Sequence, residues 1–316
     1  MKKVLISLAI ILILIIGTIG GGVWYYLNQI PRESVEHLVV NEDPAVITEN
    51  SIPTSTNSLG SDLNVLEELS KNVANYSDIT NILLLGVDSP DGVGRSDAMM
   101  IMTIDKTTKK VKLTSLIRDS YVYIAGHGMD KLNHAYAFGG ASLALRTVNT
   151  NFNMNINDFV RVNFDSMPHI IDAIGGLDID LSTAEAQTIG VPKGVNHLNG
   201  AQVLTFSRIR STAGGDFMRT SRQREVLTLM IQKLMKLNPT DMVRTANQLL
   251  PMLKTSLQPG DILGFASTVA LGQYNIVQNS FPEDATSKGM MIKQIYYLKW
   301  DKADTIEKLH KFIFNR

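Results

Sequence analysis

The N-terminal segment constrains the fold of this chain more than any other feature. Residues 4–27 contain no charged side chain, and Lys2 and Lys3 precede them. Such a run is long enough to cross a bilayer as one helix, and residues 24–26 would form an aromatic belt at its far end. The two lysines predict a cytoplasmic N-terminus. A cleaved signal peptide is the alternative, but the run is long for one and no small-residue cleavage site follows it. We therefore expect a single-pass membrane protein whose remaining residues lie outside the cell.

The overall composition excludes several classes of protein. The chain has 316 residues, a formal net charge of zero and no cysteine. The lack of cysteine excludes disulfides, thiolate nucleophiles and zinc–thiolate sites. A neutral chain that works outside the cell is not expected to bind nucleic acid.

Arginine is concentrated in one short stretch. The chain contains 18 lysines and 12 arginines, yet residues 208–224 hold five arginines and no lysine. They are Arg208, Arg210, Arg219, Arg222 and Arg224. The planar guanidinium forms paired hydrogen bonds with phosphate and carboxylate oxygens, which a lysine cannot do. The stretch therefore predicts an anion site, and outside the cell the candidate anions are lipid phosphates, envelope polymers and pyrophosphate-linked precursors.

Three regions follow from the distribution of residue types. Residues 1–27 form the cytoplasmic tip and membrane helix, and residues 28–77 form a spacer that contains Pro31, Pro44 and Pro53. A short helix is expected within the spacer at residues 63–73. Residues 78–316 form one folded domain, because no second boundary is visible.

The folded domain has an α/β pattern. Short apolar or alternating runs predict strands at residues 82–87, 98–104, 111–117 and 177–181, and a β-like segment at residues 203–209. Helical spacing predicts helices near residues 131–137, 141–152, 166–174 and 220–237, and a mainly helical C-terminal tail. This order indicates a mixed central sheet flanked by helices.

The first three predicted strands bring charged residues together. The connections between them are too short for a crossover, so neighbouring strands are antiparallel. Asp88 at the end of the first strand, Arg95-Ser96-Asp97 before the second and Arg118-Asp119 after the third are then expected at one edge of the sheet. Each could be an ordinary loop residue, but three charged groups at one edge favour a site.

Two further groups of residues point to the same anion. Arg208 and Arg210 are two apart in the β-like segment, so both side chains are expected on one side. Arg219 and Gln223 share a face near a helix N-terminus, whose unpaired N–H groups attract anions, and Arg222 is close to that face. A solvated helix start with Glu225 in a salt bridge is the alternative, and it accounts well for Arg224.

Carboxylates among arginines also suggest a divalent metal. Mg²⁺ prefers one or two carboxylates together with phosphate oxygens of the substrate. Phosphoryl transfer requires this arrangement, since its catalysis depends on positioning and charge stabilisation. A structural network of salt bridges remains the alternative. No P-loop is present, so ATP is not expected as a substrate.

Several segments, in this order, resemble the LytR-CpsA-Psr family of cell-envelope glycopolymer ligases. The matching segments are Gly86-Val87-Asp88, Arg95-Ser96-Asp97, Ile117-Arg118-Asp119, Lys131-Leu132-Asn133-His134-Ala135-Tyr136, Leu198-Asn199-Gly200-Ala201-Gln202-Val203-Leu204, Arg208-Ile209-Arg210 and Asp216-Phe217-Met218-Arg219-Thr220-Ser221-Arg222-Gln223. The resemblance covers residues 81–227 and includes the preceding membrane anchor. His134 is interpreted as structural.

The resemblance implies a transferase that joins a glycopolymer from a polyprenyl-pyrophosphate carrier to peptidoglycan through a phosphodiester. It implies Mg²⁺ at Asp88 and Asp97, and catalytic roles for Asp88, Asp97, Arg118 and Asp216. The residues that it implies for the pyrophosphate are Arg95, Arg118, Arg208, Arg210, Arg219 and Gln223. The same site with water as acceptor would be a polyprenyl pyrophosphatase, and a non-catalytic sensor of lipid pyrophosphates is a third alternative. Ser89, where many members have arginine, and a short loop over residues 89–96 depart from the family pattern.

Overall fold

The computed structural model describes residues 28, 32–33, 78–87, 94–163, 166–210, 215–236, 245, 253–272 and 274–315. The predicted membrane helix at residues 4–27 and the predicted spacer helix at residues 63–73 lie outside this part of the chain. Within the described part, no helix combines the length and the apolar content needed to cross a bilayer.

In the described part of the chain, the centre of the domain is a mixed sheet of six strands. The strands are β1 (Ile79–Val87), β2 (Ser96–Asp105), β3 (Lys110–Leu116), β6 (Asp158–Asn163), β9 (Leu253–Thr255) and β10 (Asn275–Phe281). Their spatial order is β10-β3-β2-β1-β6-β9. The first three form an antiparallel meander, while β6 joins β1 and β10 joins β3 in parallel. The three strands predicted first are confirmed, and so is the mixed α/β class, but β6 was missed.

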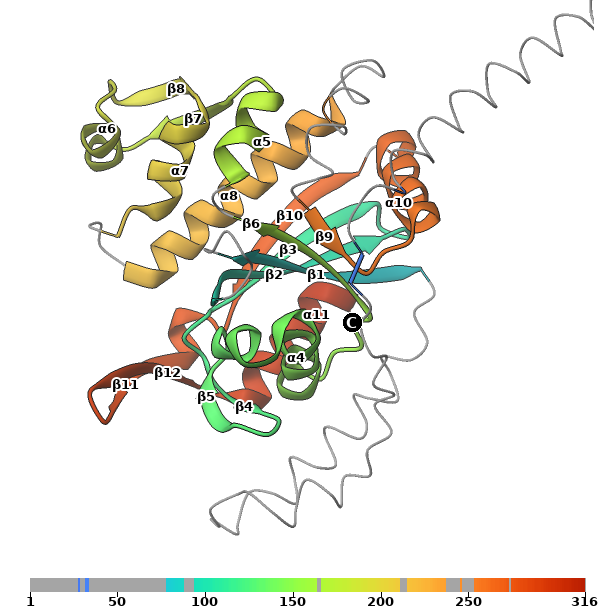
Figure 1. The fold of residues 1–316 in the computed structure, drawn as a ribbon, viewed down its shortest axis with the longest axis vertical. Helices are drawn as coiled ribbons and strands as arrows, with labels where there is room; N and C mark the ends of the chain where they lie inside the picture. Colours follow the sequence, from blue (N-terminus) through green and yellow to red (C-terminus); the bar gives the residue numbers. More distant parts are fainter. Residues whose placement is uncertain are drawn as a thin grey trace, which may run out of the picture.

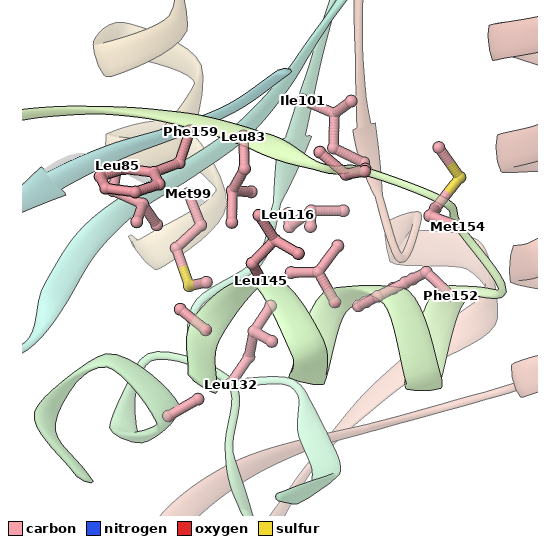
Figure 2. Packing of buried hydrophobic residues seen from close by; sticks show 14 of the residues in the cluster. Leu83, Leu85, Met99, Ile101, Leu116, Leu132, Leu145, Phe152, Met154 and Phe159 are labelled. Carbon is pink, nitrogen blue, oxygen red and sulfur yellow. The ribbon is translucent and has the colours of Figure 1, made fainter. Parts of the chain in front are cut away.

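One face of the sheet is covered by α4 (His134–Phe152) and α11 (Lys302–Phe314), as Figure 1 shows. Alternate residues of β1 and β2 point into this layer, where Leu83, Leu85 and Ile101 pack against Leu145 and Phe152 (Figure 2). The two helices predicted near residues 131–137 and 141–152 are one element, α4, which begins at His134. Its path bends at Gly139 and Gly140, and Gly140 has φ of 63°, a value that glycine adopts readily.

The opposite face of the sheet carries α8 (Gly215–Met235), which confirms the helix predicted at residues 220–237. The helix packs against β3 and β10. The Thr228 hydroxyl lies 3.2 Å from Oε1 of Gln278 on β10. A further helix, α10 (Pro259–Gly272), lies near one end of the molecule (Figure 1).

Beyond α8, a smaller lobe has a core of its own. It consists of α5 (Met167–Ala173), β7 (Leu177–Leu181), α6 (Thr183–Ile189), β8 (Gly194–Leu198) and α7 (Gly200–Arg208). Ile171, Leu177 and Phe206 are buried together there, and Val226 of α8 belongs to the same hydrophobic cluster. The lobe is therefore attached to the sheet domain through α8 (Figure 1).

The β-like segment predicted at residues 203–209 is wrong, because these residues belong to α7. Asn199 caps this helix by accepting from the backbone N–H of Gln202, and the Gln202 side chain accepts from the N–H of Asn199. This capping box fixes the start of a helix, a local signal that the β-like interpretation overlooked. Arg208 is the last residue of α7 and Arg210 follows it, so the predicted strand does not set their direction.

The prediction of a mainly helical C-terminal tail is also wrong. Besides α10 and α11, the tail contains β10, the short helix η3 (Asp284–Thr286) and a hairpin of β11 (Ser287–Ile292) and β12 (Ile295–Trp300). The hairpin base joins the chain at Asp119–Ser120, where the N–H of Leu298 donates to the Asp119 carbonyl at 2.8 Å. It also lies beside a second hairpin, β4 (Tyr121–Ile124) and β5 (Gly128–Lys131).

Candidate active site at the rim of the sheet

The end of β3 and the start of β2 meet at one edge of the sheet, which we call the rim. Met99 lies opposite Leu116, and Val87 at the end of β1 lies opposite Ser96. This register brings together two charged residues that are far apart in sequence: Arg118 donates through Nη1 to Oδ1 of Asp97. Both side chains are largely buried, with exposures of 17% and 22%. The convergence predicted for these two residues is confirmed, while Asp88 lies outside the described residues.

Arg118 is held from its other side by a buried carboxylate. Its Nε donates to Oδ2 of Asp119 at 3.2 Å, and Nζ of Lys131 binds Oδ1 of the same carboxylate at 2.6 Å. Asp119 is 3% exposed, so these pairs are only weakly screened by water. The row Asp97–Arg118–Asp119–Lys131 therefore fixes the guanidinium in one orientation. Lys131 was part of a recognised motif in the sequence, but its pairing with Asp119 could not be predicted.

A second carboxylate lies next to Lys131. Asp130 binds Nδ1 of His134 at 2.9 Å, and the hydroxyl of Tyr297 from β12 also bonds to it. Burial opposes ionisation of Asp130, but hydrogen bonds from His134 and from the Lys131 N–H outweigh it and lower its pKa. Lys131 in turn lies over the Tyr297 ring at 5.6 Å. The C-terminal hairpin thus supports the rim, an arrangement that fits the structural role predicted for His134.

Helix α8 contributes two buried polar side chains. Arg219 is 2% exposed and Gln223 is 6% exposed, and their spacing of four residues places them on one helix face, as predicted. Oε1 of Gln223 has no hydrogen-bond partner among the described residues. Helix α8 packs on β3, the strand that precedes Arg118 in the chain.

Arg222, whose role was left open by the sequence, is a structural residue. Its Nε binds Oε1 of Glu185 at 2.6 Å, and its Nη1 donates to the carbonyl of Ile209 at 3.0 Å. Burial raises the pKa of Glu185, but hydrogen bonds from Ser182 and Arg222 outweigh it, so the pKa is lowered overall. Since Glu185 belongs to α6, this ion pair connects the smaller lobe to α8. We call Arg222 and Glu185 the joint.

Arg224 is not the exposed surface charge that the sequence suggested. Its Nε and Nη1 atoms are buried and have no hydrogen-bond partner in the described part of the chain. Only Nη2 approaches an acceptor, the Ser221 hydroxyl at 3.3 Å. Burial without a carboxylate partner lowers the pKa of Arg224. A buried guanidinium with unused donors is costly unless an anion or other acceptor binds it, so Arg224 is a candidate anion-binding residue and not an exposed surface charge.

The remaining predicted site residues are either exposed or have side chains that lie outside the described part of the structure. Arg95, Arg208 and Arg210 are exposed. The side chain of Asp216 lies outside the described residues, although its backbone belongs to the first turn of α8. An additional arginine, Arg161 on β6, donates to the Tyr136 hydroxyl at 2.9 Å. Sequence reasoning missed it because the strand that carries it was missed.

The rim residues are compatible with one Mg²⁺ ion bound mainly through substrate. Asp97 uses Oδ1 for Arg118, and its Oδ2 makes no hydrogen bond to any residue that the structure describes. Among these residues there is no cluster of three or more metal-binding side chains. A single carboxylate with substrate phosphates and water is a normal environment for Mg²⁺, so Asp97 fits the predicted role.

Comparison with known proteins identifies the family. The sequence profile of the LytR_cpsA_psr family matches residues 47–311. The chain belongs to this family. A relative from Oceanobacillus iheyensis, named polyisoprenyl-teichoic acid–peptidoglycan teichoic acid transferase TagU, is 31% identical over 298 residues, which cover 91% of this chain and 86% of the relative. A TagU from Bacillus licheniformis is 33% identical over 71% of this chain and 73% of its own length.

Solved structures of the LytR-CpsA-Psr family have the same fold. TagT bound to LIIa-WTA is 28% identical, with a TM-score of 0.65 over 76% of this chain and 91% of TagT. A family protein, YwtF (TagT), with bound octaprenyl pyrophosphate lipid is 25% identical, with a TM-score of 0.60 over 75% of this chain and 91% of that protein. The ligand of the YwtF (TagT) structure is a lipid pyrophosphate.

Proposed function

We propose that this protein transfers a glycopolymer from a polyprenyl-pyrophosphate carrier to peptidoglycan and joins the two through a phosphodiester. The observation that carries the proposal is the rim pair Asp97–Arg118, held by Asp119 and Lys131. It follows strand β3, which packs against the helix that carries the buried side chains of Arg219 and Gln223. A preorganised cation next to a carboxylate is the arrangement that phosphoryl transfer needs. The names of the TagU relatives and the ligands of the TagT structures support the same reaction class.

In this proposal the arginines bind the pyrophosphate in two groups. Arg118, Arg219 and Gln223 provide fixed, buried donors, so they add little reorganisation cost when negative charge develops. Arg95, Arg208 and Arg210 are exposed and reach the pyrophosphate or the adjoining polymer from the solvent side. Arg224 is added to the buried group because of its unused donors.

The chemical step forms one bond and breaks one. A hydroxyl oxygen of peptidoglycan attacks the phosphorus that carries the polymer, and the bond from that phosphorus to the bridging oxygen breaks. Polyprenyl phosphate leaves, and the hydroxyl proton passes to a carboxylate, for which Asp88, Asp97 and Asp216 are the candidates. Mg²⁺, held by Asp97 together with Asp88, would neutralise charge on the phosphate oxygens. Arg118 stabilises the charge that develops on the same oxygens.

The proposed location follows from the substrate and from the N-terminus. Residues 4–27 would anchor the protein in the cell membrane as a single pass, with the N-terminus cytoplasmic and residues 78–316 outside. A polyprenyl carrier is itself confined to the membrane, so an anchored enzyme meets it by diffusion in two dimensions. Residues 28–77 would act as the spacer.

The decisive experiment supplies the full chain in vesicles with a polyprenyl-pyrophosphate glycopolymer, peptidoglycan fragments and MgCl₂. We expect polymer-linked muropeptides and an equal amount of polyprenyl phosphate, both measured by mass spectrometry. Replacing MgCl₂ by EDTA should abolish both products. Asp97→Asn should lower the rate by about 100-fold or more, since it removes a charge that acts on the reacting groups.

Asp178→Asn is the matched control. Asp178 is also an aspartate, but it lies exposed on β7 and pairs with His197 in the smaller lobe. It should leave the rate within about twofold of the parent, as is usual for a surface substitution. Polyprenyl phosphate without polymer-linked muropeptide would indicate a pyrophosphatase instead. Binding of the carrier without either product would indicate a non-catalytic sensor.

A further inference from the structure

The tip of the β11–β12 hairpin is an exposed apolar structure. The hairpin projects from the body of the molecule beside β4 and β5 (Figure 1). At its distal end Met291, Ile295 and Tyr296 are 63%, 47% and 43% exposed. Met291 lies opposite Tyr296, and Ile292 lies opposite Ile295, so apolar pairs occupy both faces of the tip. Exposed apolar clusters of this kind mark surfaces that bind a protein, a ligand or a membrane.

The charge of the hairpin has one sign. Residues 285–300 contain three lysines, Lys288, Lys293 and Lys299, and no acidic residue. Lys288 and Lys299 lie opposite each other near the base, and Lys293 occupies the turn. Like charges directly opposite each other weaken a hairpin, so this arrangement is unfavourable for the isolated element. It is favourable next to an anionic surface.

The residue types in the turn are also unusual for its backbone angles. Lys293 and Gln294 have φ of 47° and 65°, the left-handed values of a two-residue turn that strongly prefers Asn-Gly. The chain places a lysine there instead. Gly289 lies directly under the Tyr296 ring, where an added Cβ would come within 2.7 Å, so this glycine lets the ring pack across the hairpin. The tip is therefore a defined structure that keeps apolar and basic side chains exposed.

The base of the hairpin is connected to the candidate active site. Leu298 is hydrogen-bonded to the backbone of Asp119, and Tyr297 contacts both Asp130 and Lys131. Leu298 is four positions along the chain from Gln294 in the turn, which corresponds to roughly 13 Å along a strand. A surface that binds the tip is thereby held at a set distance from the rim.

We propose that the β11–β12 tip docks onto the anionic surface of the membrane and sets the height of the rim above the lipid headgroups. The lysine ammonium groups bind lipid phosphates, and their long stems allow the apolar side chains between them to enter the interface. A soluble polyanion would satisfy the lysines but would leave Met291, Ile295 and Tyr296 in water. The proposal rests on the membrane location given under Proposed function, and not on the transfer reaction.

The absence of cysteine from the chain permits a direct test. Met291→Cys, labelled with an environment-sensitive dye, is reconstituted as the full chain in vesicles of phosphatidylglycerol and phosphatidylcholine without any carrier substrate. We expect blue-shifted emission, quenching by spin-labelled lipid and protection from iodide in water. Replacing all three lysines by glutamine should lower the ratio of embedded to water-exposed label about fivefold for each lysine removed.

Val195→Cys provides the matched control. Val195 is 73% exposed and lies on the antiparallel strand pair β7–β8, whose strand β7 carries Asp178 and Asp180. Its label should remain accessible to iodide in the same vesicles. Ile295→Cys repeats the test from the opposite face of the tip, should the first variant fold poorly. Equal iodide quenching at positions 291, 295 and 195 would overturn the proposal.

Two other outcomes would also decide against membrane docking. Protection of the label by soluble polyphosphate without vesicles would assign the hairpin to an anionic polymer. Equal embedding in pure phosphatidylcholine would show that the lysines do not act. Flotation of the vesicles reports separately whether residues 4–27 anchor the chain, so a failure of the anchor is distinguishable from a failure of the hairpin.

Discussion

The rim and the joint use the same chemical groups for different purposes. At the rim, Arg118 pairs with two carboxylates, and the pair Asp97–Arg118 retains access to solvent. At the joint, Arg222 pairs with Glu185 and with a backbone carbonyl, and the arginine is 3% exposed. The rim arginine and its partner Asp97 remain partly exposed, whereas the joint arginine is buried and makes only structural contacts. An ion pair therefore marks a site only when at least one of its members remains accessible.

The largest effect is expected at the rim, for Arg118→Lys. Lysine keeps the charge but loses the fork that binds Asp97 and Asp119 together, so the cation is no longer oriented. Transfer should fall by about 100- to 1,000-fold, the usual cost of removing a preorganised donor. The thermal midpoint should stay within a few degrees of the parent. A large loss of stability with near-normal transfer would show that Arg118 has a structural role, like Arg222 in the joint.

The next effect concerns stability, and it is expected at the joint for Glu185→Gln. This change leaves the buried Arg222 guanidinium without its carboxylate, which typically costs about 3–5 kcal/mol. Urea unfolding should show the loss, while the rate per folded molecule stays within a few-fold. Combining it with Arg222→Met should recover part of the stability, because the uncompensated charge is removed. No recovery would mean that the pair is not the cause.

Arg224→Met sharpens the comparison, because Arg224 lies on the same helix as Arg222 but has no carboxylate partner in the described structure. Removing a desolvated charge should leave stability unchanged or raise it slightly. If the unused donors bind substrate, KM for the carrier should rise about tenfold, the typical loss for one charge-assisted hydrogen bond. Arg224→Lys should restore only part of the affinity. An unchanged KM would show that Arg224 does not bind the carrier.

The smallest effect is a pH dependence of stability at Glu225, whose pKa is influenced by both members of the joint, Glu185 and Arg222. Burial raises the pKa of Glu225 above its ordinary value of 4.5, and Glu185 raises it further against the opposing effect of Arg222. Its stabilising contribution is present below pH 4.5 and is lost as the pH rises through the folded pKa. Glu225→Gln should therefore raise stability at neutral pH relative to the parent, and the difference should vanish near pH 4. Glu185 has the opposite sign, since its lowered pKa loses stabilisation only in acid. Unfolding midpoints measured from pH 4 to pH 8 distinguish the effect of Glu225 from that of Glu185.

The parts of the fold that were predicted correctly rest on local patterns. Residues 82–87 form a wholly apolar run, and short connections follow the first two strands, so the antiparallel meander could be inferred. The meeting of Asp97 and Arg118 followed from that topology alone. Arg219 and Gln223 shared a helix face because a spacing of four residues fixes their relation.

The errors arose where a local signal was overlooked or where two signals conflicted. Residues 203–209 were interpreted as a β-like segment, but the capping box at Asn199 and Gln202 specifies a helix. The segment that forms β6 is short and lies between two predicted helices, so it was not recognised as the strand that carries Arg161. The β11–β12 hairpin has no Asn-Gly turn, which is the usual indication of a hairpin.

The sequence by itself determined the expected membrane anchor, the α/β class, the concentration of arginines and the family. These properties depend on composition and short-range spacing, which a single chain displays directly. Only the tertiary structure decided what each arginine does. Arg118, Arg222 and Arg224 have the same side chain, but one is oriented by Asp119, one is neutralised by Glu185 and one is desolvated without a carboxylate. The physical reason is that burial and the distance to an opposite charge set the behaviour of a guanidinium, and both depend on residues far away in sequence.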